Sequence, residues 1–161
     1  MRYLALLLLL VTTSVFADIG SVTEISGAGS IKRGKDTITI AKGTVIQTND
    51  KVETKNGKVK ITFKDNTTVS VTEHSSLVID DFVYDSKSGK NSKLAMKVAL
   101  GTVRYASGQI AKNDPTKVSV NTPSATVSVR GTDFTATVDE MGASTIILLP
   151  SCPNDRNTRT V

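Results

Sequence analysis

Apolar and polar residues alternate in short runs through most of the chain, and turn-forming residues separate the runs. Roughly a dozen runs recur about every 8–12 residues, a spacing typical of an all-β sandwich, barrel or solenoid. No segment shows the 3.6-residue period of an amphipathic helix. The pattern therefore predicts an all-β fold of many short strands, in a compact two-layer or twisted-solenoid body, and leaves these two arrangements open.

Particular turns and runs give sharper expectations. Asn56-Gly57, between apolar runs, predicts a two-residue hairpin, because these residues tolerate positive φ. A second hairpin is expected around residues 64–67, and a weak strand at 109–111. Residues 80–93 contain an acidic start and a Ser/Lys/Gly-rich segment, so we expect an exposed loop. Residues 145–149 contain four consecutive apolar residues after Thr145, which predicts a strand covered on both faces.

The segment 121–134 combines two strand-like runs with two backbone breaks. Pro123 lacks an N–H and belongs at the start of a strand. The alternation that follows predicts one buried face, formed by Ala125, Val127 and Val129. Gly131 interrupts this pattern, which indicates a bulge or a close backbone approach, and alternation resumes at Phe134.

The same segment carries a specific motif. Its members are Thr122, Pro123, Ala125, Val127, Val129, Arg130, Gly131, Thr132 and Phe134. This order resembles the hallmark of the FecR-type periplasmic domain, and further similarity extends over residues 20–149. Asn66 stands where relatives usually carry Gly, and both residue types suit a turn. The resemblance implies a FecR-like all-β domain at residues 18–149 and a non-enzymatic signalling role. It also implies that the motif defines the fold, so no catalytic residue or cofactor is carried over.

The start of the chain predicts export. Residues 1–3 give a short basic start through Arg2, residues 4–11 are apolar, and Val15-Phe16-Ala17 fits a signal-peptidase site. We expect residues 1–17 to be a cleaved signal peptide, since the apolar run is shorter than the ~20 residues of a membrane span. The mature protein would be periplasmic or secreted, without a stable membrane span. FecR-type architectures place a cytoplasmic anti-sigma segment and a membrane helix before this domain, and only a signal precedes it here. Control of a sigma factor across the membrane is therefore not expected.

Residues 150–161 form a polar tail with the single cysteine, Cys152. An unpaired cysteine in an exported chain suggests an intermolecular bond, a free thiol or a missing partner. Two interpretations stay open: a tail that continues beyond Val161, with a second cysteine, or a frayed end with an incidental thiol.

Lysines give the chain a mild positive charge, formally +5. They gather at positions 51, 55, 58, 60 and 64 and again at 87, 90, 93 and 97. Between 58 and 64 they alternate with apolar residues and should line a solvent face. We interpret this face as protection against aggregation, with binding of an anionic envelope polymer as the alternative. Nucleic acid is not expected as a partner, because the chain has no Trp and the nearest Phe faces inward.

Candidate catalytic and metal-binding residues are few. Gly29–Asp36 matches part of a phosphate-binding loop but places Asp36 where Ser or Thr is needed. His74 lies in a polar turn, Cys152 near the chain end, and Asp80, Asp81 and Asp85 in the expected loop. The carboxylates do not follow a calcium-loop pattern, and one His with one Cys does not make a zinc site. We therefore expect no enzymatic activity, cofactor or metal.

Arg130 and Asp133 leave one specific pairing to consider. Arg130 could form a salt bridge with Asp133 across a bulge, or present its guanidinium to a carboxylate on a partner. The structural role is favoured.

Two functions remain. The first is an exported β-domain that contacts a protein partner through a sheet edge or the 80–93 loop. The alternative is a module that binds an envelope glycan or anionic polymer through the lysine face. A hydrolase using His74, Asp81 or Asp85 ranks third.

Overall fold

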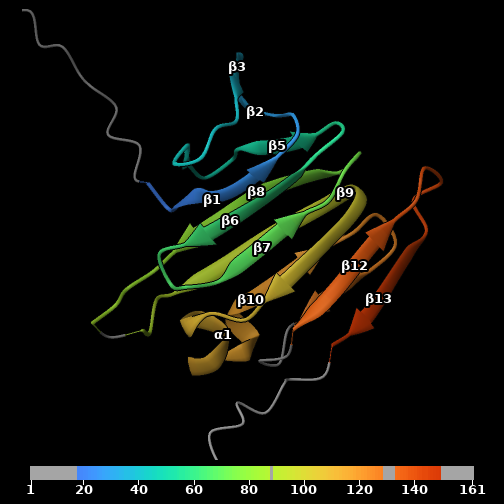
Figure 1. Ribbon diagram of the computed structural model, residues 1–161. Helices are drawn as coiled ribbons and strands as arrows, with labels where there is room; N and C mark the ends of the chain where they lie inside the picture. Colours follow the sequence, from blue (N-terminus) through green and yellow to red (C-terminus); the bar gives the residue numbers. More distant parts are fainter. Residues whose placement is uncertain (1–17, 88, 129–132, 150–161) are drawn as a thin grey trace, which may run out of the picture.

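The computed structural model describes residues 18–87, 89–128 and 133–149 (Figure 1). These residues form thirteen strands, one short helix and one 3₁₀ turn, which confirms the all-β prediction. The elements are β1 (Gly20–Ser26), β2 (Gly29–Arg33), β3 (Asp36–Thr39), β4 (Val45–Ile46), β5 (Lys51–Thr54), β6 (Lys58–Phe63), β7 (Thr68–Val71), β8 (Ser76–Val83), β9 (Lys93–Ala106), α1 (Gln109–Asn113), η1 (Pro115–Lys117), β10 (Val118–Asn121), β11 (Thr126–Ser128), β12 (Phe134–Val138) and β13 (Ser144–Leu148).

The strands form one continuous sheet that curls into two layers, and β9 belongs to both. The first layer contains β4, β1, β6, β7, the second half of β9, β12 and β13. The second layer contains β3, β2, β5, β8, the first half of β9, β10 and β11. Most neighbours are antiparallel, whereas β9 and β10 are parallel. Of the two arrangements that the pattern left open, this is the two-layer one.

The core lies between the layers and consists of the apolar residues of the alternating runs. On β6, Val59, Ile61 and Phe63 are buried, while the lysines at both ends of the run are exposed, as the alternation predicts. Phe63 of the first layer stacks on Phe82 of the second, with ring centroids 5.4 Å apart. Burial of these side chains, each worth about 1.5–3 kcal/mol, holds the two layers together.

The crossing of β9 between the layers takes place at Gly101. The strand pairs with β8 and β10 before this residue and with β7 and β12 after it. Gly101 has a φ of 82°, and a Cβ built there would lie 2.1 Å from Ser75 Oγ. Ser75 Oγ accepts a hydrogen bond from the Thr102 N–H at 3.0 Å. The separate runs of the sequence in this region therefore form one strand that changes layers at a glycine.

The hairpin predicted at Asn56-Gly57 is wrong. β5 pairs with β2 and β8, whereas β6 pairs with β1 and β7, so the chain crosses here from the second layer to the first. Neither Asn56 nor Gly57 has the positive φ that the predicted turn requires. Gly57 instead allows a close approach, since a Cβ there would lie 2.2 Å from Ser26 O. The second predicted hairpin is confirmed, with β6 and β7 paired and Asn66 at a φ of 64°.

The weak strand predicted at 109–111 is also wrong, because these residues begin α1 and bury Ile110 and Ala111. A helix of five residues is too short to display a period in the sequence. Its start is fixed by a distant residue: Asp65 O accepts from the Gln109 N–H at 2.7 Å. None of the helices in the described parts of the chain has the length and apolar character needed to cross a membrane.

The loop expected at residues 80–93 is shorter than predicted. β8 continues through Val83, and Phe82 is buried in the core. Asp80 is exposed on this strand, and Asp81 forms an ion pair with Lys93 at 3.1 Å. The acidic residues interrupt the apolar pattern here, but the strand continues because Phe82 pairs with Leu94 of β9 and packs on Phe63.

Two strands near the end of the chain are less buried than predicted. Ala125 is exposed, Val127 is half-buried, and Pro123 lies in the turn between β10 and β11. β13 pairs only with β12, and it leaves Ile147 56% and Leu148 67% exposed. The predictions of a buried face at Ala125 and of a strand covered on both faces at 145–149 are therefore wrong. Both strands lie at sheet edges, and within the described ranges each pairs with a single neighbour.

Candidate binding surface

The motif residues that the structure describes make contacts within the fold. Thr122 Oγ1 accepts from the Ala125 N–H at 3.0 Å and from Ser144 Oγ–H at 2.8 Å. It thereby joins the β10–β11 turn to the start of β13 in the other layer. Phe134 is buried and stacks on Tyr105, with ring centroids 5.1 Å apart. Val129, Arg130, Gly131 and Thr132 lie outside the described residues.

Asp133 is held by the end of β9. Its Oδ1 accepts from the Ser107 N–H at 3.0 Å, and its carbonyl accepts from the Leu149 N–H at 2.8 Å. The predicted pair with Arg130 falls on a residue outside the described ones. The contacts that are described connect β9, the segment before β12 and the end of β13.

A buried carboxylate that the sequence analysis did not single out organises the β6–β7 turn and α1. Asp65 is fully buried and accepts from the Thr67 N–H at 3.0 Å, the Thr67 hydroxyl at 2.7 Å and the Ile110 N–H at 3.3 Å. Gly108 fits closely against it, since a Cβ there would lie 2.3 Å from Thr67 N and 2.6 Å from Asp65 O. The Asp-x-Thr spacing is the signal for the local turn, but nothing in the sequence links it to residue 110.

Tyr105 lies beside the Asp65 cluster, and its buried hydroxyl should make the folded protein less stable in alkali. Burial raises the pKa of the Tyr105 hydroxyl to about 12. The nearby hydroxyls of Thr67 and Ser107 act to lower this pKa, but neither forms a well-aligned hydrogen bond with the Tyr105 hydroxyl. The folded protein disfavours the phenolate form of Tyr105. The contribution of this residue to the free energy of unfolding is therefore full below about pH 10 and is lost between about pH 10 and 12. The loss should be about 2–3 kcal/mol.

Tyr105→Phe isolates this effect. At about pH 8 its free energy of unfolding should lie within about 0.5 kcal/mol of wild type, since the hydroxyl has no well-aligned partner. At about pH 11 the variant should be the more stable protein in urea unfolding. Parallel pH profiles for the two proteins would contradict the raised pKa.

The residues with catalytic chemistry are separate or engaged in local structure. His74 is exposed in the turn between β7 and β8, with a φ of 50°. Asp85 Oδ1 accepts from the Lys87 N–H at 2.9 Å, within its own loop. Gly29–Asp36 forms the β2–β3 hairpin and does not lead into a helix. Cys152 lies outside the described residues, and the described ranges contain no cluster of three metal-ligating side chains.

Some lysines of the two clusters are paired with carboxylates, and so is Lys32 outside the clusters. Lys32 and Lys51 contact Glu53 at 2.8 and 2.7 Å, and these contacts lower the pKa of that carboxyl. Lys93 contacts Asp81. The positive charge of the two lysine clusters is thus partly neutralised. The number of lysines overstates the positive charge that is free to bind a ligand.

The outer face of the first layer carries an unneutralised cation that sequence reasoning missed. The strand register aligns one row across this face: Glu24, Lys60, Ser70, Arg104, Thr135 and Ile147. Arg104 is exposed, and its guanidinium forms no hydrogen bond or ion pair with any described residue. Lys60 Nζ contacts Glu24 Oε1 at 2.9 Å.

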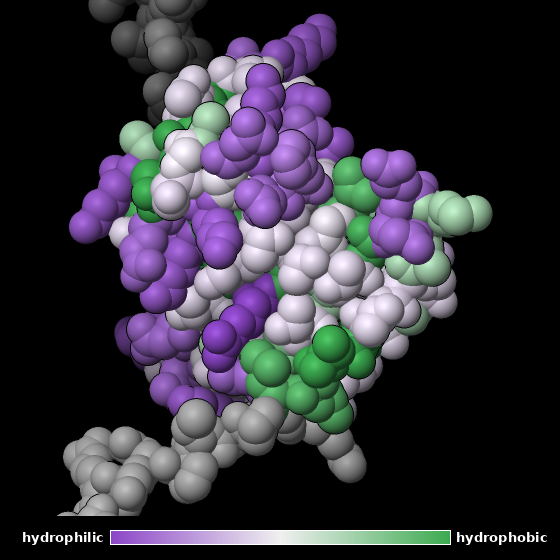
Figure 2. Space-filling model, turned by 45° about the vertical axis from the view of Figure 1, so that its right-hand side comes forward, coloured by the Kyte–Doolittle hydropathy of each residue, from purple (hydrophilic) through white to green (hydrophobic). Residues whose placement is uncertain are grey.

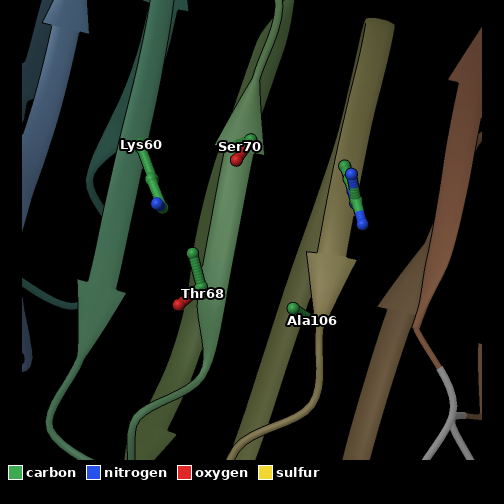
Figure 3. Close-up of a pocket in the computed structure, with 5 residues that line it drawn as sticks. Lys60, Thr68, Ser70 and Ala106 are labelled. Carbon is green, nitrogen blue, oxygen red and sulfur yellow. The ribbon is translucent and has the colours of Figure 1, made fainter. Parts of the chain in front are cut away.

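Threonine and serine occupy most of the remaining positions on this face, which appears as a pale area of intermediate hydropathy (Figure 2). Thr68 and Ser70 on β7 lie between Lys60 on β6 and the end of β9 (Figure 3). With Arg104 and Ala106, these residues line a shallow hollow of about 360 Å³. The hollow offers hydroxyl groups and two cations to a ligand.

A hydrophobic patch adjoins this face at β13. Ile147 points to the outer side in register with Thr135, and Leu148 lies in register with Phe134. Both are more than half exposed, and β13 has no strand on its far side among the described residues. An exposed strand edge without lysine or proline is open to pairing with another chain.

Comparison with known proteins finds a match to one family model. The model described as "FecR protein" matches residues 50–149. The match covers β5 to β13, including the buried Asp65 cluster, Arg104 and the free edge of β13. No curated protein matches the chain, and no solved structure matches it.

Proposed function

Because the chain belongs to the FecR protein family, we propose that it is an exported, non-catalytic module of the cell envelope that acts by contacting a protein partner. FecR proteins form a signalling-related envelope family, which favours recognition over turnover of a substrate. A sensory or interaction role in the periplasm or outside the cell follows if residues 1–17 direct export. An enzymatic role using His74, Asp81 or Asp85 gains no support from their contacts.

The free edge of β13 is the observation that carries this proposal. Strand addition at such an edge supplies backbone hydrogen bonds, and neighbouring apolar side chains supply specificity. Ile147 and Leu148 offer these apolar contacts, and no charged residue interrupts Ser144–Leu148. The 80–93 region, the other contact region expected from the sequence, forms a shorter loop, and Asp81 lies on β8 and is paired with Lys93.

Photocrosslinking at Ile147 tests the contact. A photoreactive phenylalanine analogue at this position should form a covalent adduct with one envelope protein in intact cells. Val83 is the matched control, since it is 46% exposed at the end of β8, away from this edge. The same analogue at Val83 should not capture that protein.

Ile147→Lys should weaken binding of the captured protein at least about tenfold, because a lysine disfavours edge pairing and removes an apolar contact. The binding constant is measured by titration, and a circular dichroism spectrum checks the fold. Equal adducts at both positions, or unchanged affinity of Ile147→Lys, would contradict a contact at β13.

A further inference from the structure

We propose that the outer face of the first layer binds a polymer bearing carboxylate or phosphate groups, and that Lys60, Ser70 and Arg104 form the centre of this site. The site is distinct from the β13 edge and does not depend on the protein contact proposed there. It shares Lys58 and Lys60 with the lysine face expected from the sequence and adds Arg104 from β9.

Protection against aggregation does not explain why Arg104 stands at its position on β9. Charged residues commonly guard strands at sheet edges, but here β9 is flanked by β7 on one side and β12 on the other. Its guanidinium has no partner among the described residues. A guanidinium presents a planar set of donors that matches carboxylate and phosphate oxygens.

Lys60 and Ser70 complete a site around this cation. The register places Ser70 between Lys60 and Arg104, and neighbouring strands lie about 4.7–4.9 Å apart, so the two cations are separated by about 10 Å at the backbone. Both side chains can therefore reach one anionic group or two adjacent ones. Ser70 and Thr68 add hydroxyl donors within the same hollow.

The shape of the surface favours an extended ligand. A second hollow shares Lys60 and Ser70 with the first and continues to Lys58 and Ser26. Lys58 and Lys60 are two residues apart on β6, about 7 Å along the strand. Arg104, Lys60 and Lys58 thus line one continuous path. Among the residues lining the two hollows, Glu24 is the only acidic one; it contacts Lys60, and its side chain is 71% exposed.

The chemistry of the path favours a polymer over a protein. Protein interfaces have a core enriched in aromatic residues and depleted of charge, whereas the residues lining both hollows include no aromatic side chain. Hydroxyl and cationic groups instead complement a chain of hydroxyls and anionic oxygens. The apolar residues Ile147 and Leu148 lie beyond this path, on β13.

The test titrates the protein with polygalacturonate and polyphosphate at low ionic strength, with neutral dextran and inorganic phosphate for comparison. At least one anionic polymer should bind at least about tenfold more tightly than dextran or inorganic phosphate, and the tighter of the two identifies the anionic group. Binding should weaken as salt rises, since exposed charges are screened over about 8–10 Å. Failure of both polymers to bind, or equal binding of inorganic phosphate, would overturn the proposal.

Matched variants locate the site. Arg104→Gln and Lys60→Gln should each weaken binding about fivefold or more, because each removes a charge-assisted hydrogen bond. Lys97→Gln makes the same charge change on the same strand but in the second layer, where Lys97 is exposed, and should change affinity less than about twofold. Equal losses in all three variants would show a non-specific charge effect and overturn the site.

Glu24→Gln tests whether Lys60 binds the polymer, because a purely structural role of the Glu24–Lys60 pair predicts no gain in polymer affinity. Loss of this carboxylate frees Lys60, so affinity should rise about twofold or more. Arg104→Lys keeps the charge without the planar donors and should fall between wild type and Arg104→Gln. Polyglutamate represents an acidic protein partner, and tighter binding of polyglutamate than of both polymers would overturn the choice of ligand.

Discussion

Gly101→Ala should destabilise the protein by about 2–5 kcal/mol, a large share of the stability of a domain of this size. Two costs combine. A residue with a Cβ is strained at a φ of 82°, which costs about 1–2 kcal/mol. The new Cβ would also lie 2.1 Å from Ser75 Oγ and 2.6 Å from Ser75 Cα, so the backbone must move apart where β9 changes layers, at a further cost of about 1–3 kcal/mol.

Gly43→Ala is the matched control. Gly43 has a φ of 87°, but no atom lies within 4 Å of the position of its Cβ. Only the backbone strain applies, so the loss should be about 1–2 kcal/mol. Urea unfolding of both variants measures the difference, and equal losses would show that the contact with Ser75 is not what requires glycine at position 101.

Asp65→Ala should cost about 3 kcal/mol and release α1. The substitution removes the acceptor for the Thr67 N–H, the Thr67 hydroxyl and the Ile110 N–H, all in a buried setting. Each buried donor left without a partner costs about 1–3 kcal/mol, partly offset by local relaxation. Hydrogen exchange of the amides of Gln109–Asn113 should accelerate beyond the change in global stability, because the carboxylate accepts from the Ile110 N–H in the first turn of the helix. The bond from the Gln109 N–H to the Asp65 backbone carbonyl is kept in the variant.

Asp114→Ala provides the comparison within the same chain. Asp114 makes the same local contacts, with the Thr116 N–H at 3.0 Å and the Thr116 hydroxyl at 2.6 Å, but it does so at the surface. These bonds lower the pKa of Asp114, yet water replaces them readily when they are lost. The Asp114 variant should be clearly more stable than the Asp65 variant. The reverse order would show that burial is not the reason why the Asp65 hydrogen bonds are costly to lose.

The edge strand and the outer face of the first layer show how a function can be absent from a local pattern. The run 145–149 looks like a buried strand because it contains no charge, and only the pairing of β13 with β12 alone shows that it is exposed. Arg104 likewise has no unusual sequence neighbours. Its proposed role depends on Lys60 and Ser70, which are 44 and 34 positions away in the sequence and become neighbours only through the order of the strands.

The sequence by itself determined that the chain forms strands, which residues of β6 face the core, where the β6–β7 turn lies and to which family the chain is similar. These features depend on period-2 alternation and on the conformational limits of turn residues, both of which act over a few positions. The tertiary structure alone decided that β5 and β6 belong to different layers, that β9 serves both, that residues 109–113 form a helix and that β13 is an edge. Each of these depends on contacts between segments far apart in the chain, and the free energy of such contacts overrides local preference.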